Sequence, residues 1–179
     1  MRSKKLIMKK YRSVFLILFS LALLLFGNSC QKDKLDGEVL NNPALAEELY
    51  SKAKDTIVFE NQNLVLETEL YRDFFPGVPS NGKTNLQALL WLISVDSSSI
   101  TEPFSITKLY IINNNEVWVS VPDKRNDDYL PEYKSHYVSI NGPQWDTGLK
   151  VDVVVALTRV SNSKEYFLIA HDQTIARIE

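Results

Sequence analysis

Cysteine is almost absent from this chain, because Cys30 is the only one among 179 residues. No intramolecular disulfide can form, so the hydrophobic core alone must stabilise the fold. Histidine is nearly as scarce, with only His136 and His171. A structural or catalytic zinc ion takes three or four His, Cys or carboxylate ligands. Since the two histidines lie far apart in the sequence, we expect neither a metal nor a cofactor.

Sequence motifs of catalysis are also missing. The chain has no Gly-x-Ser-x-Gly elbow and no glycine-rich phosphate loop. A Ser-His-Asp triad assembles in space, so a hydrolase remains an alternative. The segment Asp123–Asp128 offers oxygen ligands for calcium, but Lys124 and Arg125 within it oppose a cation. We therefore interpret this segment as a solvated loop.

The most apolar segment near the N-terminus, residues 14–26, is only 13 residues long. A helix that spans a bilayer needs about 20 residues. Six basic residues and no acidic residue precede this run, namely Arg2, Lys4, Lys5, Lys9, Lys10 and Arg12. This order of charge and hydrophobicity is typical of a secretory signal, with a retained membrane anchor as the alternative.

Cys30 lies where the apolar run stops, in the sequence Gly27-Asn28-Ser29-Cys30. This segment resembles a lipobox of the Bacteroidota type, in which the cysteine is lipidated and becomes the mature N-terminus. Two or more acyl chains hold a protein firmly on a membrane. The resemblance implies a signal peptide over 1–29, a lipid-anchored Cys30 and a flexible tether over 30–42.

The residues after Cys30 bear on the location of the protein. Gln31-Lys32-Asp33 resembles the start of the surface-export signal of lipoproteins in that group, and Lys34 departs from the pattern. We expect a lipid-anchored protein of the outer membrane. The sequence leaves open whether it faces the periplasm or the cell surface.

Charge is distributed unevenly along the chain. Six of the 20 basic residues and none of the 22 acidic residues precede Cys30, so the remainder carries 14 basic and 22 acidic groups and a formal charge of −8. A domain of that charge is not built to neutralise phosphates, so we expect no nucleic-acid partner.

Residues 43–54 are predicted to form a short helix. Asn42 is a favourable N-cap, and proline is tolerated at the first helical position, which Pro43 would occupy. Leu45, Leu49 and Ala53 recur every fourth residue and form a narrow apolar stripe.

From residue 55 to 179 the hydrophobic pattern has a period of two, which predicts strands. We expect about eight, near residues 64–71, 86–95, 107–112, 116–121, 137–140, 150–160, 165–170 and 174–178. Many short strands with turn signals between them favour an all-β fold, an antiparallel immunoglobulin-like β-sandwich with one short N-terminal helix. A small β-barrel is the alternative.

Local phrases of the predicted domain resemble small, exported bacterial β-sandwich domains of unknown function. The phrases are Leu70–Pro76, Glu116–Trp118, Asn141–Trp145 and Val151–Val155. The resemblance implies a fold and supplies no activity.

Aromatic residues are the main candidates for contacts with a ligand or partner. Trp118, Tyr129, Tyr133 and Trp145 could stack on sugar rings or anchor a protein interface, or they could instead fill the core. Arg72 and Asp73 follow a predicted strand and could either contact a partner or fix the corner at which the strand ends.

These features favour a non-enzymatic interaction or accessory module of the cell envelope. Its partners would be the membrane, through Cys30, and an envelope protein or a glycan. The predicted contact surfaces are the loops 121–137 and 141–149 and an edge strand. A carbohydrate-binding lipoprotein and a hydrolase are the two alternatives.

The lipidation hypothesis predicts the behaviour of a Cys30→Ala variant. Because only the thiol can carry the thioether-linked lipid, the variant should accumulate as an uncleaved precursor without acyl label. Metabolic labelling with a fatty-acid analogue, followed by electrophoresis, measures both properties. Label that persists in the variant would exclude this site of lipidation.

Overall fold

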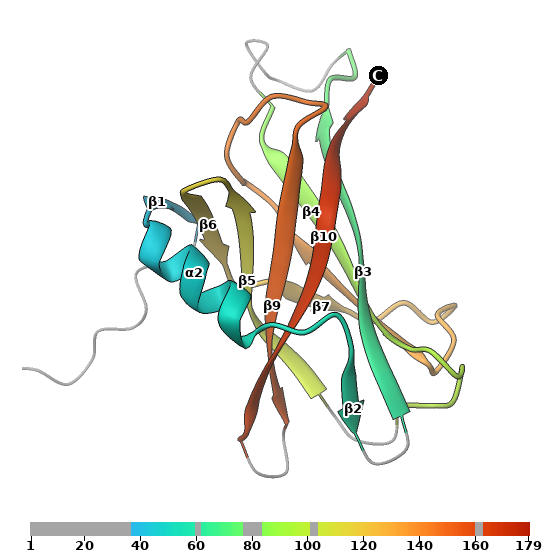
Figure 1. Cartoon of the computed structure of the whole chain (residues 1–179). Helices are drawn as coiled ribbons and strands as arrows, with labels where there is room; N and C mark the ends of the chain where they lie inside the picture. The colour runs from blue at the N-terminus through green and yellow to red at the C-terminus, as the bar shows by residue number, and fades with distance from the viewer. Residues whose placement is uncertain (1–36, 60–61, 77–83, 101–103, 160–162) are drawn as a thin grey trace, which may run out of the picture. The chain divides into compact units, whose positions relative to one another are not determined.

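A computed structural model describes residues 37–59, 62–76, 84–100, 104–159 and 163–179 (Figure 1). All of them belong to one compact unit, Leu35–Glu179. The predicted signal peptide, Cys30 and the first part of the predicted tether lie outside the described residues. None of the helical structure described has the length and hydropathy that a membrane span requires.

The described residues form ten strands and one helix, which confirms the prediction of an all-β fold with a short N-terminal helix. In chain order these are β1 (Glu38–Asn41), α2 (Pro43–Lys52), β2 (Ile57–Phe59), β3 (Gln62–Asp73), β4 (Leu86–Ser94), β5 (Phe104–Asn113), β6 (Glu116–Ser120), β7 (Asp123–Arg125), β8 (Lys134–Ser139), β9 (Lys150–Arg159) and β10 (Glu165–Ile178).

Helix α2 begins as the sequence predicts. The side chain of Asn42 accepts a hydrogen bond from the Leu45 amide at 3.1 Å, and Pro43 occupies the first turn. The helix ends at Lys52, two residues earlier than predicted, because Ala53 adopts an extended conformation. The chain then runs alongside β10 before it reaches β2 (Figure 1).

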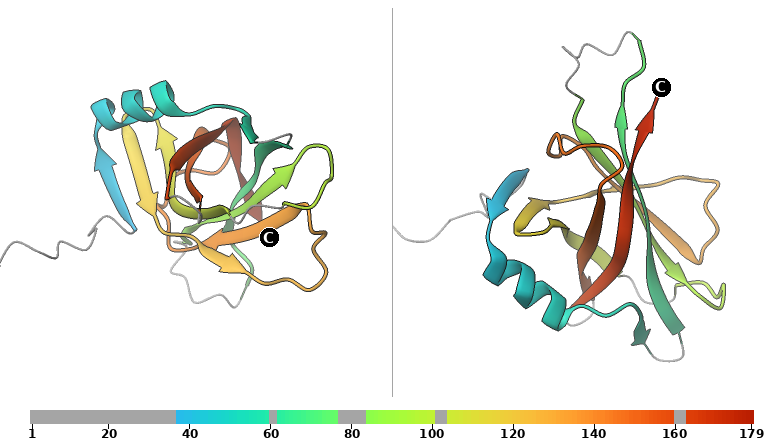
Figure 2. Two further views of the ribbon diagram at one scale, coloured as in Figure 1. Left: turned by 90° about the horizontal axis from the view of Figure 1, so that it is seen from below. Right: turned by 45° about the horizontal axis from the view of Figure 1, so that its top comes forward.

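The strands follow one path, in the order β1-β6-β5-β9-β10-β3-β4-β8-β7, and β2 pairs with β3 beside that path. The sheet curls on itself, so its inner face encloses most of the core (Figure 2). Strand β10 joins the two halves of the sheet. Its first part pairs antiparallel with β9, and its last four residues pair parallel with β3.

The structure corrects the prediction of two separate strands near 165–170 and 174–178. They form the single strand β10, which bends at a bulge where His171 and Asp172 stand opposite one residue of β9. Asp172 has a φ of 54°, in the left-handed region that aspartate tolerates. The parallel pairing that follows the bend also means that the sheet is not wholly antiparallel.

Two hydrophobic clusters stabilise the unit. The inner cluster joins the facing sides of the curled sheet, and its largest members are Trp118, Tyr137, Leu64, Leu86, Leu90, Leu92, Leu109, Ile111, Leu157, Leu168 and Ile175. The outer cluster lies under α2, where Ala46 and Leu49 pack on Val117, Val119, Val154 and Ile169. Strands β6 and β9 are therefore buried on both faces.

Part of the predicted tether is a strand. Residues 38–41, expected to be flexible, form β1, which pairs antiparallel with β6. Leu40 also packs against the outer cluster, which explains why this short polar segment is fixed to the sheet. Strands β1 and β7 stand at the two ends of the path, and all three residues of β7 are exposed and charged. Such charged edges oppose pairing with other chains.

Gly142 is a position where the curled sheet leaves no room for a side chain. Its amide donates to Leu86 O at 2.9 Å, and an added Cβ would lie 2.9 Å from Leu86 Cβ and 3.0 Å from Trp118 Cη2. Gly142→Ala should lower the free energy of unfolding by about 1–3 kcal/mol, the usual cost of overpacking. Urea denaturation measures this loss.

The exposed neighbour Asp146 provides the control for this prediction. Asp146→Ala should change the free energy of unfolding by less than about 0.5 kcal/mol, as is usual for surface substitutions. Equal stability of Gly142→Ala and the wild-type protein would contradict the close packing described above.

Candidate functional site

The structure places Trp118 in the core. Its side chain is fully buried in the inner cluster, because Val117 and Val119 on the other face of β6 pack under α2. Within the described part of the chain, the indole nitrogen has no hydrogen-bond partner. Trp118 therefore cannot contact a ligand at the surface, and we withdraw it from the candidate contact residues.

The other three aromatic candidates fall at the two ends of β4, with Tyr129 and Tyr133 at one end and Trp145 at the other. At one end of this strand, Tyr133 O accepts from the Ser94 amide at 3.0 Å, and at the other end Leu86 O accepts from Gly142, near Trp145 in sequence. Nine residues of strand span about 26 Å. Tyr129 is fully exposed, in the same loop as Tyr133. Tyr133 and Trp145 therefore do not form one stacking platform.

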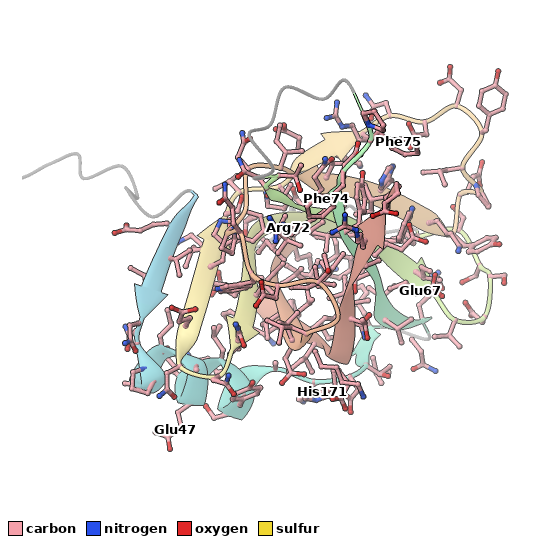
Figure 3. All side chains as sticks on the ribbon, turned by 90° about the horizontal axis from the view of Figure 1, so that it is seen from above. Glu47, Glu67, Arg72, Phe74, Phe75 and His171 are labelled. Atoms are coloured by element: carbon pink, nitrogen blue, oxygen red, sulfur yellow. The ribbon has the colours of Figure 1, made fainter. Side chains whose placement is uncertain are left out.

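Arg72 is buried and fixes the corner at which β3 ends. Its Nε donates to Thr84 O at 2.8 Å, and Nη1 donates to Trp145 O at 2.8 Å and to Gln144 O at 3.3 Å. The ring of Phe74 lies close to this guanidinium and to that of Arg177, with centroid-to-Cζ distances of 5.1 and 4.0 Å. Figure 3 shows Arg72 and Phe74 side by side.

Asp73 belongs to the same corner. Its Oδ1 accepts a hydrogen bond from the Phe75 amide at 2.9 Å, a local turn that directs the chain out of β3. Trp145 is tied down nearby, since its indole nitrogen donates to Glu116 Oε2 at 2.8 Å. The interactions of Arg72, Asp73 and Trp145 thus agree with a structural corner rather than a contact surface.

His136 lies against Asp127 in the loop that follows β7. Its Nδ1 is 2.5 Å from Asp127 Oδ2, and its ring stacks on Trp91 at 5.2 Å. A shallow cavity of about 280 Å³ lies beside them, lined mainly by polar residues of 124–136. Among the described residues, however, the buried Nε2 of His136 has no partner. No described hydroxyl is positioned for this imidazole to activate as a nucleophile.

His171 lies at the β10 bulge, beside the end of α2 (Figure 3). Its Nδ1 is 3.2 Å from Asp152 Oδ1, and its Nε2 is 3.5 Å from Asp55 Oδ1. Asp152 also accepts hydrogen bonds from the Asp172 amide and from the Tyr50 hydroxyl, at 2.9 and 2.8 Å. Both ring nitrogens face carboxylates, so this cluster ties α2 and its linker to the bulge.

A larger cavity, of about 460 Å³, opens where the first part of β10 and strand β2 diverge. We call it the seam pocket. It is lined by Lys52, Lys54, Thr56, Ile57, Val58, Glu165, Tyr166 and Phe167. Its volume lies within the range of small-molecule and peptide sites.

The seam pocket combines apolar surface with positive charge. Val58 is 72% exposed at its rim, and Tyr166 and Phe167 supply aromatic rings. The Lys52 ammonium lies 5.6 Å from the Phe167 ring and also pairs with Glu48, and Lys164 lies 5.0 Å from the Tyr166 ring. Within the lining itself, the ammonium groups of Lys52 and Lys54 stand beside one carboxylate, that of Glu165.

Sequence reasoning missed the seam pocket because its two walls are more than a hundred residues apart. The linker after α2 and the start of β10 are joined by the parallel bridge between Lys54 and Leu168. No motif marks either segment. The run Ile57–Phe59 is apolar throughout, so a strand there has to turn an apolar side chain outward, and this was the available signal.

Comparison with known proteins adds no assignment to this geometry. No protein-family model, no curated protein and no solved structure matches the chain. Across the residues that the structure describes, no group of three or more His, Cys, Asp or Glu side chains is arranged to hold a metal ion. The lipoprotein signal and the likeness to small exported domains accordingly stay predictions.

The Tyr50–Asp152 contact predicts a change of stability with pH. Burial, and then the hydrogen bond and charge of Asp152, raise the pKa of Tyr50 to about 12. An unfolded chain releases this proton near pH 10, so the stabilisation is complete below about pH 10 and is lost as the pH rises toward 12. Because Tyr50 is 43% exposed and solvent weakens the contact, urea denaturation of wild-type protein and Tyr50→Phe should differ by only about 0.5–1 kcal/mol at pH 8.

That difference should shrink as the pH rises above 10. Tyr129→Phe is the matched control, because Tyr129 is fully exposed, and it should change the free energy of unfolding by less than about 0.5 kcal/mol at pH 8. A gap between wild-type protein and Tyr50→Phe that stays constant up to pH 11.5 would contradict the linkage.

Proposed function

We propose that this protein is a lipid-anchored, non-enzymatic interaction module of the cell envelope, which binds a partner protein through the seam pocket. The observation that carries the proposal is the seam pocket itself, an open, partly apolar cavity bordered by lysines on an otherwise acidic chain. Apolar surface with a few well-placed charged groups is what a binding site requires.

The anchoring part of the proposal rests on Cys30 and the segment before it. The basic residues, the 13-residue apolar run and the lipobox-like Gly27–Cys30 support export and lipidation. The outer membrane is the proposed location, and either face is compatible with these residues.

The non-enzymatic part rests on the two histidines. Asp127 and Asp152 hold the Nδ1 atoms of His136 and His171, and the Nε2 of His171 faces Asp55. A hydrolase of the serine or cysteine type would need a nucleophile beside one of these rings. The positions of the aromatic side chains argue against a glycan-binding role, since Trp118 is buried and Tyr133 and Trp145 lie at opposite ends of β4.

The finer architecture is part of the proposal as well. We regard the two halves of the curled sheet as the layers of an immunoglobulin-like sandwich that share β10, with a small barrel as the alternative. The lengths of β9 and β10 and the core between the two halves support the sandwich.

Site-specific photo-crosslinking in cells that produce the protein tests the proposed function. A photoreactive residue at position 58 lies at the rim of the seam pocket and should give a discrete adduct with an envelope protein. Position 140 is the matched control, because Ile140 is 52% exposed and lies away from β2. It follows Ser139 of β8, which pairs with Ala88 of β4, and Ala88 pairs with Leu70, near the end of β3 that is distant from β2.

Each outcome of this experiment is informative. An adduct from position 58 that is absent from position 140, and that is lost in Cys30→Ala cells, is the expected result. Absence of any adduct from position 58 would count against the seam pocket as the contact surface. An adduct that survives Cys30→Ala undiminished would separate partner binding from membrane anchoring.

A further inference from the structure

Among the described residues, one edge of β10 is only partly paired where it borders the seam pocket. In an antiparallel pair, the backbone groups of successive residues point alternately to the two sides of a strand. Lys54 N donates to Phe167 O at 3.0 Å, and Ile169 N donates to Lys54 O at 3.1 Å. Residues 165, 167 and 169 therefore turn their backbone groups away from β9 and toward the linker after α2.

The bridge at Lys54 uses only part of this edge. A continuing strand would next pair with the Glu165 carbonyl and the Phe167 amide. The chain cannot provide that strand, because the residues before Ala53 belong to α2, which ends at Lys52. Between described residues, no hydrogen bond outside the β9 ladder reaches the Phe167 amide. The Glu165–Phe167 edge is therefore open toward the pocket.

The opposite wall of the pocket is also the border of a strand. Strand β2 pairs with β3 on one side, and Thr56, Ile57 and Val58 line the pocket. The slot thus lies between β10 and β2, where the sheet splits because β10 joins β3 only from Ile175 onward. Figure 1 shows β2 and the start of β10 on the two sides of this split.

The side chains around the slot determine which strand would fit. Successive residues of an inserted strand point to opposite faces. One face would meet apolar lining such as Ile57 and Tyr166, and the other would lie near the lysines. Lys52 and Lys54 line the slot together with one carboxylate, that of Glu165. Lys52 also pairs with Glu48, so Lys54 is, among the described residues, the lining lysine that has no ion pair. Complementary charge favours an acidic segment.

We propose that the seam pocket accepts an extended, acidic peptide segment of the partner protein, which pairs as an added strand with the Glu165–Phe167 edge of β10. This inference rests on the proposed function and specifies how the partner is recognised. Main-chain hydrogen bonds supply affinity in this binding mode, and alternate side chains supply specificity. Apolar β-branched residues alternating with Asp or Glu are the sequence that the slot recognises.

A substitution at Glu165 separates backbone pairing from side-chain contacts. Glu165 is the first residue of β10, a position where proline is tolerated, and its amide faces the pocket rather than β9. Glu165→Pro removes this donor and places the proline ring on the edge that the added strand needs. Glu165→Thr is the matched control, since it removes the same carboxylate and keeps the amide.

The binding assay uses the full chain in detergent and a fluorescent peptide of alternating Asp and Val, eight residues long. Fluorescence anisotropy should show saturable binding to wild-type protein and to Glu165→Thr. Binding to Glu165→Pro should be at least about tenfold weaker, the effect of losing a main-chain hydrogen bond and blocking the edge. A Lys-Val peptide of the same length should bind at least tenfold more weakly than the Asp-Val peptide to every variant, because the slot is positive.

Amide hydrogen exchange of the wild-type protein provides a second measurement that does not depend on how Glu165→Pro folds. The Phe167 amide should exchange more slowly when the Asp-Val peptide is bound, because it then donates to the peptide backbone. An unchanged exchange rate at Phe167 with the peptide bound would overturn the added strand. Equal affinity of Glu165→Pro and Glu165→Thr would overturn it as well.

Failure of this inference can be told apart from failure of the proposed function. If position 58 still crosslinks to a partner protein but the Asp-Val peptide does not bind, the acidic strand is excluded and the interaction module stands. If the position-58 adduct carries a glycan instead of a polypeptide, both the added strand and a protein partner are excluded.

Discussion

The fold depends on the bend of β10. This strand begins as the neighbour of β9 and ends as the neighbour of β3, so it carries the hydrogen-bond ladder from one half of the sheet to the other. The bend requires an unpaired residue, and the bulge at His171 and Asp172 provides it. Asp152 holds the bulge in place by accepting from the Asp172 amide and facing the His171 ring.

The same bend creates the seam pocket. Because β10 pairs with β3 only from Ile175 onward, the first part of β10 and the start of β3 do not pair with each other. Strand β2 and the linker after α2 fill part of the space between them. A buried strand edge normally finds a partner, since unpaired backbone groups are costly away from water. Among the described residues, the Phe167 amide on this edge has no such partner, which is the feature on which the proposed binding role rests.

Burial explains why Trp118, a candidate contact residue, is part of the core instead. A curled sheet with a helix on its outside buries both faces of β6, so an aromatic side chain on either face of that strand supplies core packing. Arg72 illustrates the converse, because a charged residue is tolerated inside when three backbone carbonyls accept its hydrogen bonds. Residue type alone could not distinguish these structural roles from contact roles.

The sequence by itself determined what short-range physics controls. The two-residue period predicts most of the strands, and Asn42 and Pro43 start the helix. Only the tertiary structure decided that 165–178 is one bent strand, that residues 38–41 belong to the sheet, and that Lys54 meets Phe167. Those outcomes depend on pairings between segments that are distant in the sequence. The local hydrophobic pattern does not specify which strand edges pair with each other.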